Sequence, residues 1–223
     1  MSILNVREVA GKVGQQIKAE VSLLKKSTGK VPGVTLVLVG DNPVCQMDIR
    51  AKDRIAAEMG IDTHTIRLEK DVSQDVVIKE VLRLNQDDSV DAVMIQLPLP
   101  EPLDPWEILC HLEPGKDMDR YNPVSMGMSL LNRTRLFPCA PAGILKIFEH
   151  YRIKVEGMNA VVVGRSFYVG KPVAALLINL DATVTLCHSK TKDLKEALNN
   201  AELVVTALGR PGVVTGDMIR PGA

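Results

Sequence analysis

The sequence lacks a net charge, a long apolar run and any closely spaced pair of cysteines. Its 27 basic and 27 acidic side chains balance, so the chain has no overall electrostatic field that would attract nucleic acid or an anionic membrane surface. No apolar run reaches the length needed to span a bilayer. We therefore expect neither nucleic acid nor a membrane as a partner, and any anionic ligand has to be held by a local site.

The cysteines are far apart and form no CxxC pair; they are Cys45, Cys110, Cys139 and Cys187. This spacing argues against a zinc site and against a disulfide framework, so we expect no metal and reduced thiols. The N-terminus carries charges where a signal peptide would be apolar. Both features favour a cytoplasmic protein. The apolar surroundings of Cys110 and Cys187 predict packing residues rather than reactive thiols.

Strand and helix patterns alternate along the first half of the 223 residues. A continuous β-branched run at 33–40 is typical of a strand buried on both faces, and further strands are predicted at 62–68 and 90–100. Helical spacing is found at 47–60 and 73–86. Successive strand–helix–strand units predict a parallel sheet. An amphipathic helix at 7–26 is long enough to cover one face of that sheet.

A second strand–helix series follows a segment rich in turn formers. Residues 115–141 show little periodicity and are predicted to be a long functional loop. A helix is predicted at 142–153. Beyond it, strands are expected at 158–165, 182–188 and 202–209, with helices at 171–180 and 192–201.

These patterns predict an α/β protein of two domains. Residues 1–120 form an N-terminal three-layer α/β domain with a parallel sheet, 121–150 an interdomain loop and helix, and 151–223 a Rossmann-like nucleotide-binding domain. The sequence stops at "MIRPGA", where a doubly wound domain would supply another strand. We therefore expect either an incomplete chain or another element that covers the exposed strand edge.

The stretch "VVVGRSFYVGKPVAALL" is the strongest local signal for a phosphate site. Gly164 ends a buried strand, Gly170 lies in a short loop, and the following helix offers N–H groups and a positive dipole end. Arg165 can bind a phosphate with two hydrogen bonds. The spacing is not GxGxxG, so a tight turn without a ligand is an alternative of comparable weight.

The stretch "CHSKT" ends the next strand, where Rossmann-type folds bind the adenosine ribose. An acidic residue there would favour NAD, whereas Ser189 and Lys190 suit a 2′-phosphate. NADP is therefore favoured over NAD. On the residues alone, His188 is an ordinary hydrogen-bonded histidine.

A second constellation combines Lys52, Gln96 and Asp119. Gln96 lies at the carboxyl end of a predicted parallel strand, where open α/β sheets place ligands. A buried amide there could orient a lysine that transfers protons. On spacing alone, each of the three residues is more often structural than catalytic.

Seven stretches together make the chain similar to a known family. They are "VGDNP" upstream of Lys52, "IQLPLP", "PGKDMD", "FPCAPAGI", "VVVGRSFYVGKPVA", "TVTLCHSKT" and "MIRPGA". In this order they resemble the bifunctional methylenetetrahydrofolate dehydrogenase/cyclohydrolase (FolD) family over essentially the whole chain. The resemblance implies a folate cleft between two domains, a homodimer, and a place in one-carbon metabolism that includes purine biosynthesis.

The resemblance also implies roles for individual residues. NADP-dependent oxidation of methylenetetrahydrofolate would give methenyltetrahydrofolate, and its hydrolysis would give 10-formyltetrahydrofolate. Lys52 would be the acid/base residue, Gln96 would tune it and Asp119 would bind the folate. The tetrahydrofolate-type substrate would also contact Asp48, Cys45, Leu97, Pro98 and Pro141. NADP would contact Gly164, Arg165, Ser166, Gly170, His188 and Ser189.

Three positions depart from the family pattern. Asp48 replaces a tyrosine four residues before Lys52, Cys45 replaces a serine, and Arg120 replaces a glycine. A carboxylate four residues before a helical lysine stabilises the ammonium form, which is the wrong form for a base. An arginine at a glycine position with positive φ would intrude on the ligand. The alternative is a weak or inactive homologue that binds nucleotide, folate or a partner subunit without turnover.

Overall fold

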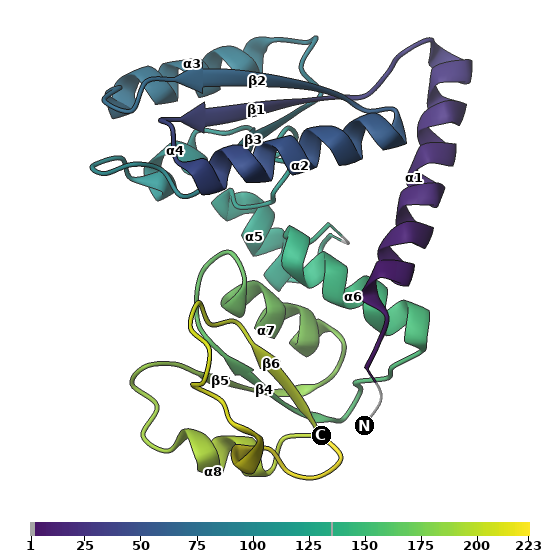
Figure 1. Cartoon of the computed structure of the whole chain (residues 1–223), viewed down its shortest axis with the longest axis vertical. Helices are drawn as coiled ribbons and strands as arrows, with labels where there is room; N and C mark the ends of the chain where they lie inside the picture. Colours follow the sequence, from purple (N-terminus) through teal and green to yellow (C-terminus); the bar gives the residue numbers. More distant parts are fainter. Residues whose placement is uncertain (1–2, 135) are drawn as a thin grey trace. The chain divides into compact units, whose positions relative to one another are not determined.

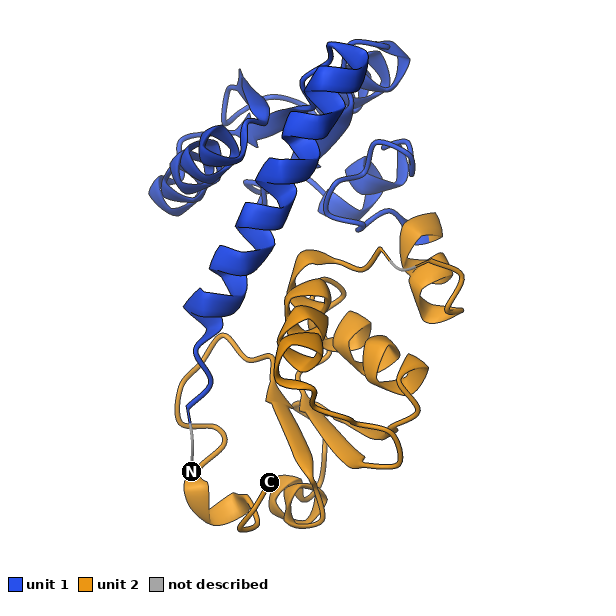
Figure 2. Cartoon of the chain, turned by 90° about the vertical axis from the view of Figure 1, so that its right-hand side faces the viewer, with its two compact units in different colours: residues 1–123 blue, residues 124–223 orange. Residues whose placement is uncertain are grey.

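The structure, a computed structural model, describes residues 3–134 and 136–223. The chain divides into two compact units, Met1–Pro123 and Val124–Ala223 (Figure 2). The predicted domain limits at 120 and 150 stay a prediction. No helix among the described residues combines the length and the apolar character needed to cross a membrane.

The first unit contains a parallel sheet of three strands, β1 (Gly33–Val39), β2 (Asp62–Leu68) and β3 (Ala92–Ile95). Their order is β2-β1-β3. Gly33 pairs with Asp62 in β2, and Val34 pairs with Ala92 in β3. The central strand is therefore the one with the most continuous apolar run, as expected for a strand that is buried on both faces.

Helices cover both faces of this sheet (Figure 1). They are α2 (Pro43–Met59) on one face, and α3 (Gln74–Gln86) with α4 (Pro105–Cys110) on the other. Leu36 and Leu38 of β1 pack with Cys45 and Ile49 of α2 and with Met94. The opposite layer buries Val77, Val81, Leu84, Ile108 and Leu109. The predicted three-layer α/β arrangement is confirmed.

Helix α2 begins at Pro43 rather than at the predicted residue 47. The Asn42 side chain caps it by accepting a hydrogen bond from the Val44 N–H at 2.9 Å, and proline is favoured in the first turn. The helix ends at Met59 and is capped by Gly60, whose φ of 80° is left-handed. This earlier start adds Cys45 to the helix that carries Asp48 and Lys52.

Helix α1 (Val6–Thr28) does not cover a sheet face as predicted. Among its residues only Val9 is buried, and α1 packs against the C-terminal end of α2. A Cβ added at Gly60 would lie 3.4 Å from Val21 of α1, and one at Gly14 would lie 3.0 Å from the Met59 side chain. Helical spacing of apolar residues predicted the helix correctly, but it does not determine which surface the helix contacts.

The second unit contains another parallel sheet with strands β4 (Asn159–Val163), β5 (Thr183–Cys187) and β6 (Leu203–Thr206), in the order β5-β4-β6. Its helices are α5 (Pro123–Leu130), α6 (Cys139–Tyr151), α7 (Gly170–Asn179), α8 (Leu194–Asn199) and a 3₁₀ turn at Gly216–Met218. The Rossmann-like prediction is confirmed at the level of an α/β layer fold.

The two faces of this second sheet have separate apolar cores. Ala160 and Val162 pack with Val173 and Leu177 of α7 and with Phe148 of α6. On the other face, Val161 and Val163 pack with Cys187 and with Leu198 of α8. The alternation of β4 residues between the two cores is the period of two that a strand requires.

The segment predicted as one long loop, 115–141, contains helix α5 and short strand-like pairing. Gly127 and two serines lower the helix propensity of α5, which is why the sequence did not indicate a helix there. Before it, the Val93 N–H donates to the Lys116 carbonyl at 2.7 Å, and the Met118 N–H donates to the Val93 carbonyl at 3.1 Å. Residues 116–118 therefore run beside β3.

Candidate functional site

The first candidate site lies where the strand order of the first sheet reverses. The connections after β1 and β3 leave this point in opposite directions, which is where open α/β sheets bind ligands. Helix α2 follows β1 and carries Lys52, while Gln96 follows β3 directly. The Gln96 N–H donates to the Val37 carbonyl at 2.9 Å, and the residue is only 4% exposed.

Lys52 and Gln96 form a direct hydrogen bond. The Lys52 Nζ donates to Gln96 Oε1 at 3.0 Å. On its other side, Gln96 Nε2 donates to the Leu97 carbonyl at 2.9 Å and, in a longer contact of 3.4 Å, to Asp48 Oδ2. Two acceptors on the nitrogen side hold the amide oxygen toward the lysine. The structure thus brings together two of the three predicted catalytic residues.

Asp48 lies beside Lys52, as the spacing of four residues predicted. Its Oδ2 is 3.6 Å from Lys52 Nζ, and the side chains are 56% and 40% exposed. A solvent-exposed ion pair of this kind is worth about 0.3–0.5 kcal/mol. The pair therefore places a weakly attractive negative charge beside the Lys52 ammonium group.

Cys45 ties α2 to the loop after β3. Its Sγ lies 3.6 Å from the Leu97 carbonyl and 3.8 Å from the Pro98 carbonyl, both within reach of a weak S–H donor. Burial first, and the Asp48 carboxylate second, raise the pKa of the Cys45 thiol. Cys45, Leu97 and Pro98 thus line the same corner as Lys52, and the thiol stays protonated at neutral pH.

The four thiols should differ in their reactivity. Burial also raises the pKa of Cys187, whereas Cys110 and Cys139 are exposed, so the prediction of Cys110 as a packing residue was wrong. A raised pKa keeps the thiolate fraction low until the pH rises above the ordinary thiol range. At pH 8 we expect iodoacetamide to label Cys110 and Cys139 well before Cys45 and Cys187, as measured by peptide mass spectrometry. Equal labelling rates in the folded protein would contradict this.

Asp119 and Arg120 follow the strand-like segment 116–118 at the end of the first unit. Asp119 is half-buried. Arg120 has a φ of 61°, so the position does require the left-handed conformation that a glycine adopts freely. The Arg120 side chain donates from Nη1 to the Pro114 carbonyl at 2.9 Å. That bond fixes its guanidinium on the protein's own backbone.

The Arg120 position allows a stability test with two variants. Arg120→Ala keeps the left-handed strain and loses the bond to Pro114, whereas Arg120→Gly loses the bond and relieves the strain. A non-glycine residue in this conformation costs about 1 kcal/mol. We expect the alanine variant to be less stable than the glycine variant by about that amount in urea unfolding. Equal stabilities would show that the backbone there is unstrained.

The second candidate site lies at the carboxyl edge of the second sheet, also at a reversal of strand order. Gly164, with a φ of 121°, and Gly170 meet there at very close range. A Cβ on Gly170 would lie 2.0 Å from the Gly164 carbonyl oxygen, and one on Gly164 would lie 2.3 Å from the Ala207 carbonyl oxygen. Only glycine fits at these two positions, so packing alone already requires both.

Ser166 accepts hydrogen bonds from backbone N–H groups in the first turn of α7. Its Oγ accepts from the Gly170 N–H at 3.2 Å, and its carbonyl accepts from the Lys171 N–H at 3.0 Å. Pro172 has no N–H. The expectation that this helix end offers its first N–H groups to a phosphate was therefore wrong, because Ser166 takes them. Ser166 still has its hydroxyl proton to donate.

His188 organises the loop after β5. Its Nδ1 accepts from the Lys190 N–H at 3.1 Å, and its backbone N–H bonds to Thr191 Oγ1 at 2.8 Å. These bonds leave Ser189 at the exposed tip of a tight turn. Arg165, at the end of β4, is exposed as well. The adjacent strands thus present a guanidinium and a hydroxyl along one edge, a donor set that fits a phosphorylated cofactor.

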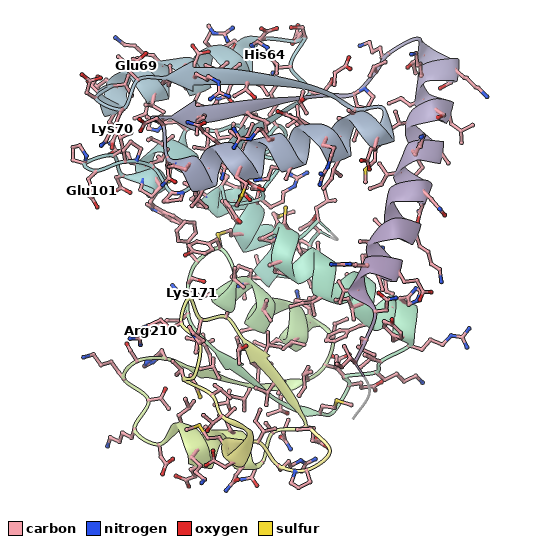
Figure 3. The ribbon with its side chains drawn as sticks, in the orientation of Figure 1. His64, Glu69, Lys70, Glu101, Lys171 and Arg210 are labelled. Atoms are coloured by element: carbon pink, nitrogen blue, oxygen red, sulfur yellow. The ribbon has the colours of Figure 1, made fainter. Side chains whose placement is uncertain are left out.

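Two further basic residues lie near the carboxyl edge of the second sheet, and the sequence analysis did not predict them. Lys171 lies in the first turn of α7 and Arg210 lies in the loop after β6; both are exposed on the same side of the second unit (Figure 3). Arg210 also lines a pocket of ≈ 490 Å³ with Thr206 and Leu208. Neither residue belongs to a motif; the available signals were that Lys171 opens the predicted helix 171–180 and that Arg210 directly follows the predicted strand 202–209.

Pro141, the remaining predicted substrate contact, lies in the second unit. It is buried in the first turn of α6, and its role stays a prediction. Within residues 3–134 and 136–223, no group of three or more histidine, cysteine, aspartate or glutamate side chains is arranged to hold a metal ion.

Each of the two sheets has polar residues where its strand order reverses. The first sheet carries the Lys52–Gln96 pair, and the second has the glycines and donors typical of a dinucleotide-binding α/β domain. Two family models match this chain. The tetrahydrofolate dehydrogenase/cyclohydrolase catalytic domain matches residues 4–119, and the NAD(P)-binding domain of the same family matches residues 138–223. The chain belongs to the tetrahydrofolate dehydrogenase/cyclohydrolase family, the FolD family that the sequence resembles.

Curated relatives and solved structures agree with this assignment. The bifunctional protein FolD of Streptococcus agalactiae is 37% identical over 99% of this chain and 78% of that protein. FolD of Streptococcus pneumoniae is 39% identical over the same shares. The FolD crystal structure from Campylobacter jejuni superposes with a TM-score of 0.95 at 34% identity, covering 99% of this chain and 78% of that one. The Trypanosoma brucei enzyme, solved with NADP and an inhibitor, has a TM-score of 0.92 at 31% identity, covering 98% and 75%.

Proposed function

We propose that this protein oxidises methylenetetrahydrofolate with NADP⁺ and hydrolyses the resulting methenyltetrahydrofolate to 10-formyltetrahydrofolate. The observation that carries the proposal is the 3.0 Å bond from Lys52 Nζ to the buried Gln96 Oε1 at the carboxyl edge of the first sheet. A lysine held by a buried amide at a ligand-binding edge is positioned to move protons. Membership of the family supports the same pair of reactions.

The residues of the first unit would have separate roles in proton transfer and substrate binding. Lys52 takes the proton from the attacking water and returns one to the departing nitrogen. Gln96 fixes the position of the Lys52 Nζ through its amide oxygen. Asp119 binds the polar end of the folate. Asp48, Cys45, Leu97 and Pro98 would contact the substrate beside Lys52.

The residues of the second unit would hold NADP. Arg165, Ser166 and Ser189 supply charge and hydroxyl donors, and Gly164, Gly170 and His188 shape the backbone around them. Lys171 and Arg210 add positive charge to the same edge. No acidic side chain stands at the tip of the loop after β5, which favours a 2′-phosphate and thus NADP over NAD. When bound, NADP⁺ supplies the acceptor for the substrate's hydride.

A second candidate function is supported by one contact. Asp48 Oδ2 lies 3.6 Å from Lys52 Nζ, and a carboxylate favours the ammonium form over the free base. A homologue that binds folate or nucleotide but turns over slowly, or serves as a partner subunit, is therefore the alternative. Asp48→Tyr distinguishes the active enzyme from this alternative, because it removes the carboxylate and provides an aromatic ring beside Lys52.

The assembly and location are proposals as well. A homodimer through the second unit is supported by exposed apolar side chains, including Leu131 at 67% and Ile178 at 53%. Four free cysteines support a reducing, cytoplasmic location. There, 10-formyltetrahydrofolate would supply one-carbon units, purine biosynthesis included.

The test follows methenyltetrahydrofolate by its absorbance. Purified protein is given methylenetetrahydrofolate with NADP⁺ or NAD⁺ in parallel, and methenyltetrahydrofolate alone is used to measure hydrolysis. We expect turnover in both assays and a higher rate with NADP⁺. A folded sample that catalyses neither reaction, but gains activity in Asp48→Tyr, would support the alternative instead.

A further inference from the structure

Asp48 closes a ring of three side chains that the family pattern does not predict. The ring runs from Lys52 Nζ to Gln96 Oε1, from Gln96 Nε2 to Asp48 Oδ2, and from Asp48 Oδ2 back to Lys52 Nζ, with separations of 3.0, 3.4 and 3.6 Å. One carboxylate oxygen therefore contacts both partners. The Asp48 carboxylate attracts the Lys52 ammonium group by its charge. It also accepts from Gln96 Nε2, which keeps Gln96 Oε1 directed toward Lys52.

The two reactions of the proposed function differ in their need for a proton acceptor. In the oxidation, one C–H bond of the substrate's methylene group breaks and its electron pair leaves with the hydride to NADP⁺, so no proton moves to or from the protein. In the hydrolysis, a C–O bond forms to water and a C–N bond breaks. Water loses two protons, one of which goes to the released nitrogen and the other to solvent.

We propose that Asp48 is a positioning residue that sets the balance between these two reactions: its negative charge lies against the Lys52 ammonium group and slows hydrolysis relative to hydride transfer. This inference rests on the proposed function. It predicts a protein that releases more methenyltetrahydrofolate than one without a carboxylate at this position. The effect is graded, because the ion pair is about half exposed on each side.

The key variant is Asp48→Asn. The asparagine oxygen can still accept from Gln96 Nε2, so the amide keeps its orientation while the charge beside Lys52 is lost. We expect the ratio of hydrolysis to hydride transfer to rise about twofold, the rate equivalent of an exposed ion pair. Asp48→Glu restores the charge on the same helix face and should return the ratio to that of the original protein.

The matched control is Glu8→Gln. Glu8 pairs with Lys12 at 2.8 Å in the same spacing of four residues, on α1, with similar exposure of the two side chains. Removing this carboxylate should leave the ratio unchanged. Melting curves by circular dichroism establish that each variant is folded before its rates are compared.

The outcomes are distinct. A raised ratio in Asp48→Asn that Asp48→Glu reverses supports the inference, since a general loss of packing would not be rescued by charge. An unchanged ratio overturns it while leaving the proposed function intact. A lowered ratio overturns it too, and would make the carboxylate itself the proton acceptor. A folded original protein and folded variants that catalyse neither reaction would overturn the proposed function and the inference together.

Discussion

Replacing Lys52 with methionine is expected to lower the hydrolysis of methenyltetrahydrofolate by about 100-fold to 10,000-fold, the usual contribution of a positioned acid/base group. Methionine keeps most of the length of the side chain but has no proton to exchange. Hydride transfer should fall less, because it moves no proton through the protein. The measurement is the initial rate in each assay, with substrate concentrations varied to separate kcat from KM.

The lysine variant needs a control for both charge and folding. Lys79→Met removes an exposed lysine from α3 in the same unit and should leave both rates unchanged. Lys52→Met also leaves the buried Gln96 oxygen without its donor, which costs about 1–3 kcal/mol of stability, so each sample must be shown to be folded. Hydrolysis within about threefold of the original rate would remove Lys52 from the mechanism.

Gly170→Ala is expected to be the most damaging small substitution in the second unit. The added Cβ would lie 2.0 Å from the Gly164 carbonyl oxygen and 2.6 Å from its carbon. Because backbone atoms cannot move aside as a flexible side chain can, the start of α7 has to shift. We expect a loss of about 3 kcal/mol in the free energy of unfolding, and much weaker NADP⁺ binding as measured by isothermal titration calorimetry.

Gly143→Ala is the matched control for the glycine variant. Gly143 lies inside α6, and a Cβ there meets no atom within 4 Å. Alanine should therefore be neutral or stabilise the protein by up to about 1 kcal/mol, because it reduces the freedom of the unfolded chain. If both alanine variants melted at the same temperature, the close approach of Gly164 and Gly170 would not exist in solution.

The elements of the fold were largely predictable because their signals are local. β2 was predicted at its observed bounds, since alternating β-branched residues and flanking turn formers mark a strand by themselves. Helix α5 was missed because glycine and serine weaken the local signal and packing supplies the rest. For α1, the helix was predicted correctly but its contact surface was not, because an apolar stripe does not specify its partner.

In the candidate site too, local contacts were predictable and long-range contacts were not. The pairing of Asp48 with Lys52 followed from a helical spacing of four residues. The bond from Lys52 to Gln96 joins residues 44 positions apart, and no spacing rule reaches that far. The use of the first N–H groups of α7 by Ser166 also depended on the exact path of the loop.

By itself, the sequence determined the two α/β units, the parallel sheets and the family, because periodicity, turn residues and ordered motifs are properties of the chain. Only the tertiary structure decided what each polar group bonds to. It showed that Arg120 is turned onto the Pro114 carbonyl and that Asp48 closes a ring with Gln96 and Lys52. The physical reason is that hydrogen bonds and ion pairs depend on separations of a few ångströms, which arise only when distant segments have packed together.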